Sequence, residues 1–255
     1  MKNSLLYCCL LLICACSGNK DNSEQLPASV KKAQEIIASA ITKQGGQLVA
    51  QSRIAFDFRD RHYVSSRSGG NFTYERIFTD TLNHKVHDQL SNDNFQRKIN
   101  ETVVALSAKD SAAYSNSVNS VIYFAFLPYF LNDAAVQKDY LGEVSIKGEP
   151  YHKVKVTFRK EGGGKDFEDQ FVYWFHKDKM SMDYLAYNYQ VDGGGARFRE
   201  AYNVRIVNGI RFADYINYKP INKSMEVETF DELFEKGKMK EVSRIDLENI
   251  SVERL

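Results

Sequence analysis

The chain has 255 residues, with 34 Lys and Arg against 33 Asp and Glu. This balance lacks the basic excess of a nucleic-acid-binding protein and therefore excludes that class. Aromatic residues make up 13% of the chain, a content that favours strands and a large buried core. All four cysteines lie within the first sixteen residues, so the remainder has no thiol for a disulfide, a metal ligand or a nucleophile.

The N-terminus has the pattern of an exported protein. Lys2 precedes an apolar stretch over residues 5–13, which is too short to cross a bilayer core of about 30 Å. The next residues, Ile13-Cys14-Ala15-Cys16, resemble the bacterial lipobox. The resemblance implies cleavage before Cys16 and its modification with fatty acyl chains such as palmitate. An ordinary secretory signal that contains cysteines is the alternative.

These features predict the domain organisation and the location. We expect a signal peptide over residues 1–15, a polar tether over residues 16–26 and a single domain over residues 27–255. Two or more acyl chains hold a protein firmly on a membrane, at about 0.8 kcal/mol per buried CH₂. Ser17 after the cysteine, in place of Asp, resembles the sorting signal of outer-membrane lipoproteins. We therefore expect a lipid-anchored envelope protein at the outer membrane, on either its periplasmic or its outer face.

A helix is the first predicted element of the domain. Residues 27–43 begin with a proline, end just before Gly45-Gly46, and carry one apolar stripe at helical spacing. We expect this helix to pack on a sheet. The period then changes to two, which predicts strands over residues 49–58, 63–66, 71–80 and 82–90. Residues 95–110 fit neither pattern clearly.

A second helical segment is predicted in the middle of the chain. Residues 111–131 contain the apolar run SVNSVIYFAFLPYFL, and Pro128 should break it into one or two helices. This run is short and interrupted for a transmembrane span.

The C-terminal half has the pattern of an antiparallel meander. Glycine-rich turns at residues 162–164 and 193–195, and the strong hairpin signal Asn208-Gly209, separate short strand-like segments. We expect these strands over residues 143–146, 152–160, 167–176, 182–191, 197–207 and 211–218, with a last strand over residues 238–250. The sum is an α+β fold: a curved antiparallel sheet, or incomplete β-barrel, with an N-terminal helix and a central helical insert.

This order of elements resembles the superfamily of lipoprotein carriers that includes LolA, LolB and LppX-like proteins. The resemblance implies an incomplete barrel whose helices cover the concave side and leave an apolar cavity for acyl chains. The segments YHKVKVTF and NGIRFADYINY are similar to a family of Bacteroidota lipoproteins of unknown function. That second resemblance implies no functional residues.

No catalytic constellation is found. His84 and His87 would share a face only on a helix, and their surroundings are strand-like, so we interpret them as surface residues and expect no metal site. Both triple glycines lead into predicted strands, whereas a phosphate loop leads into a helix. The sequence therefore predicts a protein without a cofactor and without enzymatic activity.

Aromatic residues are the candidate ligand-binding groups. An apolar cavity for a lipid or another amphiphile would be lined or covered by Tyr123, Phe124, Phe126, Phe130, Tyr173, Tyr184 and Tyr187. The alternative is that these side chains fill the core. In that case the protein would be a structural or accessory subunit of an envelope complex. A hydrolase whose residues converge only in three dimensions is the third hypothesis.

Overall fold

The computed structural model describes residues 26–161, 168–190 and 193–255. The predicted signal peptide with Cys16, almost all of the tether and the turn at residues 162–164 lie outside the described residues. The helices are α1 (Ala28–Lys43), α2 (Gly46–Val49), α3 (Ala108–Ala125) and α4 (Phe230–Glu235), with the short 3₁₀ segments η1 (Tyr129–Asn132) and η3 (Val227–Thr229).

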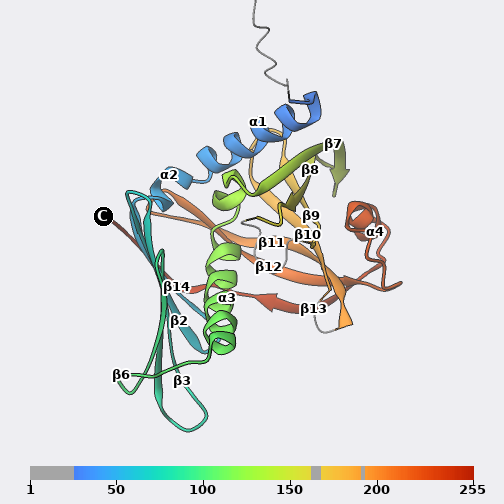
Figure 1. The fold of residues 1–255 in the computed structure, drawn as a ribbon. Helices are drawn as coiled ribbons and strands as arrows, with labels where there is room; N and C mark the ends of the chain where they lie inside the picture. Colours follow the sequence, from blue (N-terminus) through green and yellow to red (C-terminus); the bar gives the residue numbers. More distant parts are fainter. Residues whose placement is uncertain (1–25, 162–167, 191–192) are drawn as a thin grey trace, which may run out of the picture.

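The strands of the described chain form two antiparallel sheets (Figure 1). Sheet A has the order β14 (Glu248–Arg254), β1 (Ser52–Phe58), β2 (Arg61–Ser68), β3 (Asn71–Thr79), β4 (Lys85–Ser91), β5 (Phe95–Ile99) and β6 (Thr102–Val103). Sheet B has the order β13 (Met239–Ile245), β12 (Ile210–Pro220), β11 (Gly195–Val207), β10 (Met182–Tyr189), β9 (Phe171–His176), β8 (Glu149–Phe158) and β7 (Val136–Ile146). The sheets are not closed into a barrel.

The α+β class, the antiparallel curved sheet, the N-terminal helix and the central helical insert are confirmed. The prediction of one continuous strand over residues 238–250 is wrong, because the chain leaves sheet B after Ile245 and enters sheet A at Glu248. Between them, the Leu247 amide donates a hydrogen bond of 2.9 Å to Oδ1 of Asp214, which is buried. This contact fixes the bend at which the last strands divide between the two sheets.

Helix α1 forms as predicted and packs along β7, at the edge of sheet B (Figure 1). Its buried stripe consists of Ala33, Ile36, Ile37 and Ala40. The strand predicted from residue 49 begins only at Ser52, because Gly45 turns the chain in the left-handed region, at φ +81°, and the helical turn α2 follows it.

The central helix starts inside the segment that showed no clear pattern. The Ser107 hydroxyl accepts a hydrogen bond of 3.1 Å from the Asp110 amide, which caps the first turn of α3. The helix ends at Ala125, and Pro128 separates it from η1 as predicted. Of the described helices, none has the length and hydrophobicity that a membrane span requires.

The hairpin predicted at Asn208-Gly209 is confirmed. Both residues have positive φ angles, 45° and 87°, and Val207 pairs with Ile210 across the turn. Helix α4 was not predicted. It lies beside sheet B on the face opposite α3, where Phe230 is buried and Phe234 packs on Phe198.

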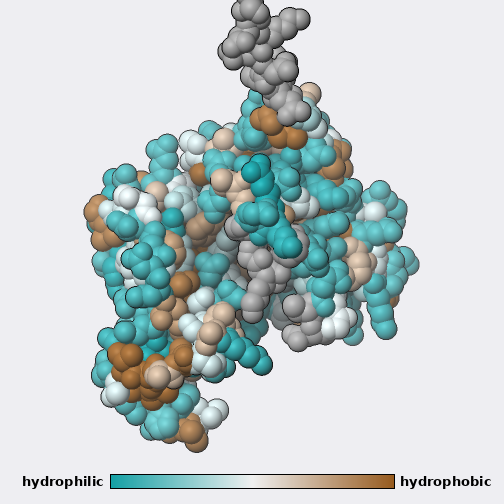
Figure 2. Space-filling view, viewed as in Figure 1, coloured by the Kyte–Doolittle hydropathy of each residue, from teal (hydrophilic) through white to brown (hydrophobic). Residues whose placement is uncertain are grey.

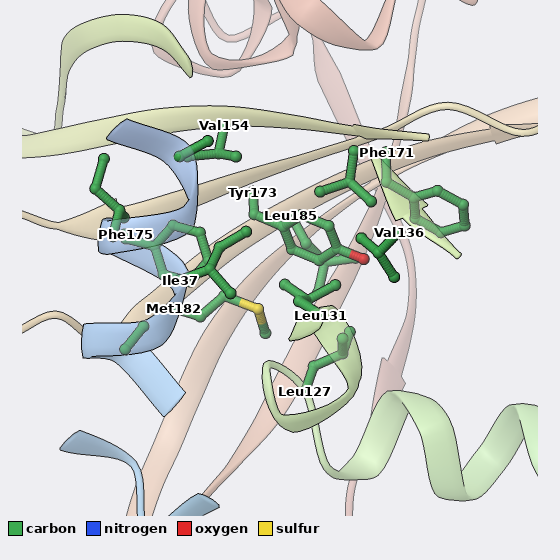
Figure 3. Packing of buried hydrophobic residues seen from close by; sticks show 14 of the residues in the cluster. Ile37, Leu127, Leu131, Val136, Val154, Phe171, Tyr173, Phe175, Met182 and Leu185 are labelled. Carbon is green, nitrogen blue, oxygen red and sulfur yellow. The ribbon is translucent and has the colours of Figure 1, made fainter. Parts of the chain in front are cut away.

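Three apolar clusters form the core. The first lies between α1, η1 and sheet B, where Ile37, Leu131 and Tyr173 are completely buried (Figure 3). The second joins α3 to sheet A, and the third lies between sheet B and α4. The visible surface is mainly hydrophilic, with apolar residues gathered near β6, whose Val103 is exposed (Figure 2).

Candidate ligand-binding cavity

Helix α3 lies in the angle between the two sheets (Figure 1), and a buried ionic cluster fixes it on sheet A. Asp88 of β4 is completely buried and accepts hydrogen bonds from Arg76 and Arg97, at 2.5 to 2.9 Å. Arg76 Nη1 in turn donates to Ser117 Oγ of α3 at 2.7 Å, and the Arg97 guanidinium lies 3.5 Å from the centre of the Tyr114 ring. The polar cluster therefore sets the position of α3.

The C-terminal half of α3, beyond Ser117, borders a cavity of about 370 Å³. Its walls are α3, the end of β1 and the inner face of sheet B. The lining residues are Phe58, Arg59, Ser120, Val121, Phe124, Ala125, Tyr187, Arg199, Ala213, Tyr215, Asn217, Ser243, Ile245 and Leu247. Most of these side chains are apolar or aromatic, and the volume is within the range of small-molecule sites, about 300–1,000 Å³.

The register of sheet B places three polar side chains of this wall in one row. Arg199 on β11 pairs with Asn217 on β12, and Asn217 pairs with Ser243 on β13. Leu185 of β10 continues the row on the other side of Arg199. Since paired residues of neighbouring strands point to the same face, the polar groups form a short band across an otherwise apolar wall.

Arg199 is the central charged group of the cavity. Its guanidinium lies 4.5 Å from the centre of the Phe124 ring and 5.0 Å from that of Tyr187, and its Nη2 donates to the Tyr187 hydroxyl at 2.8 Å. Nε is buried without a hydrogen-bond partner. In the described part of the chain, no carboxylate forms an ion pair with Arg199. Aromatic faces stabilise this cation but leave its charge uncompensated.

The other polar groups add to this character. Asn217 Nδ2 donates to Ser243 Oγ at 3.2 Å, while the buried Oδ1 of Asn217 has no partner. Burial raises the pKa of Tyr215, so this phenol stays protonated and can donate a hydrogen bond. Arg59 contributes a second, exposed guanidinium at the end of β1. None of the described lining residues is Asp or Glu.

The aromatic residues singled out from the sequence are divided among three environments. Phe124 and Tyr187 line the cavity, with ring centres 5.6 Å apart. Phe126, Phe130 and Tyr173 are buried in the clusters around it.

The two remaining candidates are Tyr123 and Tyr184. Tyr123 bridges the first two clusters, where it stacks on Phe130 at 5.1 Å, and burial raises the pKa of its hydroxyl. Tyr184 lies on the opposite face of sheet B and stacks on Phe198 at 5.6 Å. The structure thus brings two of the seven candidates to the cavity wall and packs the others around or behind it.

Sequence reasoning missed the polar band. Arg197 and Arg199 alternate with the buried Ala196 and Phe198, a pattern that indicates a polar outer face. The signal that distinguishes Arg199 is its register with Asn217, which depends on strand pairing. In the described chain, no group of three or more His, Cys, Asp or Glu side chains is placed to hold a metal ion.

Comparison with known structures gives distant similarity over most of the chain. A DUF1329 family protein from Desulfovibrio piger has 12% identity and a TM-score of 0.54, with 88% of this chain and 93% of that chain covered. A LolA superfamily protein from Nitrosomonas europaea has 10% identity and a TM-score of 0.45, with 85% and 94% covered. The Mycobacterium tuberculosis lipoprotein LppX has 12% identity and a TM-score of 0.29, with 63% and 90% covered. Of these three structures, the Desulfovibrio piger protein has a TM-score above 0.5, and its similarity to this chain is one of fold.

A search of curated proteins found no match. The sequence comparison with families did: residues 2–247 match a family of unknown function, DUF6503. The match covers the N-terminal segment, both sheets up to β13 and every residue that lines the cavity. The chain is therefore a member of the DUF6503 family.

Proposed function

We propose that this protein is a lipid-anchored envelope protein that holds a hydrophobic or amphiphilic ligand in the cavity between α3 and sheet B. The observation that carries the proposal is the cavity itself, a space of about 370 Å³ with a mainly apolar wall. Burial of apolar ligand surface there would contribute roughly 25 cal/mol per Å². The similarity to LolA superfamily and LppX chains agrees with this role.

The ligand can be tested on the chain from position 16 onward, with Cys16→Ser so that the protein carries no acyl chain of its own. We expect mass spectrometry of an organic extract of the purified protein to find lipid in stoichiometric amount. Ala125→Trp places a large side chain in the cavity wall and should abolish this lipid. The control is Ala112→Trp on the exposed face of the same helix, which should retain it. An extract free of lipid, together with no binding of added decanol, would favour the alternative of an accessory subunit of an envelope complex.

The anchor is a separate part of the proposal and rests on the lipobox resemblance at Cys16. We expect the full chain to fractionate with membranes and to be released into the soluble fraction of the envelope by Cys16→Ser. Continued processing and membrane fractionation of the Cys16→Ser chain would contradict an anchor at this sulfur.

A further inference from the structure

The charge in the cavity has a consequence for the kind of ligand. An ionised group that is partly removed from water is unfavourable unless an opposite charge or several hydrogen bonds compensate it. Arg199 makes one hydrogen bond, to Tyr187, and packs between two aromatic rings, and its Nε has no partner. Arg76 and Arg97 are paired, because they share Asp88. Arg67 resembles Arg199, with one hydrogen bond to Tyr74, aromatic rings around it and a buried Nε without a partner, but it does not line the cavity. Of these arginines, Arg199 is the one that lines the cavity without a counter-charge.

The arrangement of Arg199 fits an anionic head group. The terminal edge of a guanidinium carries one N–H from each Nη, and a carboxylate or phosphate can accept from both at once. Nε of Arg199 is enclosed by protein and is not one of these donors. Asn217 is next to Arg199 in the same row.

The apolar part of the lining fits an alkyl chain. Val121 and Phe124 of α3 line the cavity together with Ile245 and Leu247 from the other end of the chain. The described lining has no carboxylate that would repel an anion, and the second guanidinium, Arg59, is exposed at its border. Charge and apolar surface are thus present together, in a volume suited to one chain.

On the basis of the proposed function, we propose that the ligand is an anionic amphiphile with a single alkyl chain. Its head group pairs with Arg199, with Arg59 close to the entrance, and its chain lies against the apolar wall. The shared chemistry is an anionic oxygen head, which a free fatty acid supplies as a carboxylate and a lysophospholipid supplies as a phosphate.

The test compares probes of one alkyl length: decanoate, decyl phosphate, decanol and decyltrimethylammonium, measured by titration calorimetry on the Cys16→Ser chain. We expect both anions to bind about tenfold or more tightly than decanol, the size of one charge-assisted hydrogen bond, and the cation to bind least. The tighter of the two anions identifies the source of the head group.

Single-residue variants test whether Arg199 causes the preference for anionic probes. Arg199→Met should reduce anion affinity about tenfold and change decanol affinity less than about threefold. The matched control is Arg197→Met, two residues along the same strand, where the guanidinium lies over Tyr189 and does not line the cavity. This variant should keep the order of probes. If Arg199→Met does not fold, Arg59→Asn replaces it, because Arg59 is exposed and Asn tolerates its φ of +58°. Arg59→Asn should then weaken the anions selectively, by a smaller factor.

The possible failures are distinguishable. Equal binding of decanoate, decyl phosphate and decanol by the wild-type chain would overturn the anionic head group and leave the proposed function in place. The same conclusion would follow if Arg199→Met weakened decanol as much as the anions. Binding of none of the four probes would overturn both proposals.

Discussion

Replacement of Asp88 by Asn tests whether the buried ionic cluster that positions α3 is also needed for ligand binding. Asp88 is completely buried and accepts four hydrogen bonds from Arg76 and Arg97. The variant keeps the shape of the side chain but leaves two guanidinium groups without a counter-charge under α3. Removal of one partner of a buried ion pair typically costs about 3–5 kcal/mol. In a domain of this size, where 1 kcal/mol corresponds to roughly 2–4 °C, the melting temperature should fall by about 6–20 °C.

The variant should also weaken ligand binding, because α3 is one wall of the cavity and Arg76 fixes it through Ser117. The control is Asp231→Asn. Asp231 is buried and bonded to Lys153 at 2.9 Å, on the opposite face of sheet B. It should lower the melting temperature and leave the decanoate affinity unchanged within about twofold, less than the loss of one net hydrogen bond.

Calorimetric melting and decanoate titration of both variants provide the check. The reasoning would be refuted if Asp88→Asn melted within about 2 °C of the wild type, since that is less than 1 kcal/mol. It would also be refuted if Asp231→Asn reduced the decanoate affinity as strongly as Asp88→Asn. In that case loss of binding would follow general destabilisation and not the position of α3.

Two further predictions concern the frame of the fold. Gly45 and Gly148 share a φ of +81°, but a Cβ at Gly45 would lie 2.3 Å from the Gly209 carbonyl oxygen, whereas a Cβ at Gly148 would meet nothing. Replacement of either glycine by Ala should lower the free energy of unfolding by about 1–2 kcal/mol, because the backbone is left-handed. Gly45→Ala should lower it by about 1–3 kcal/mol more because of the close contact. Urea unfolding of both variants measures the difference. Burial lowers the pKa of His152 below 6.5, despite the opposing charge of Glu143. The unfolded chain therefore takes up this proton first, so stability should fall as the pH decreases from 6.5 toward the folded pKa and stay constant above 6.5. Replacement by Gln should flatten this part of the urea-midpoint profile, and parallel profiles would contradict the assignment.

The elements that could be predicted from the sequence are those whose signals are local. The helix over residues 27–43 has its own stripe, proline start and glycine end, and the Asn208-Gly209 turn depends on two adjacent residues. The break in the last predicted strand depends on Asp214, 33 residues before the amide that it binds. Helix α4 has six residues, too few for a periodic signal, and its Phe230 is buried only because sheet B is present.

The residues of the candidate site also divide into those with a local sequence signal and those whose position depends on strand pairing. Aromatic density pointed to Phe124 and Tyr187, which do line the cavity. Tyr184 and Tyr187 are three residues apart on β10, so they point to opposite faces of sheet B, but aromatic density does not indicate which of these faces borders the cavity. Arg199 was missed for a related reason, since an arginine in an alternating strand predicts a solvent-facing position unless the pairing of the strands is known.

The space beside α3 follows from how the helix is held and from which side chains it presents. The ionic cluster positions α3 against sheet A, so the helix cannot move freely toward sheet B to close the gap. Four of the lining positions carry small side chains: Ser120 and Ala125 on the helix and Ala213 and Ser243 on the sheet side. Large side chains at these positions would fill the volume, as Ile122 does where the same helix packs on sheet A. A fixed helix and small lining residues therefore leave room for a chain, and Arg199 determines the charge of its head.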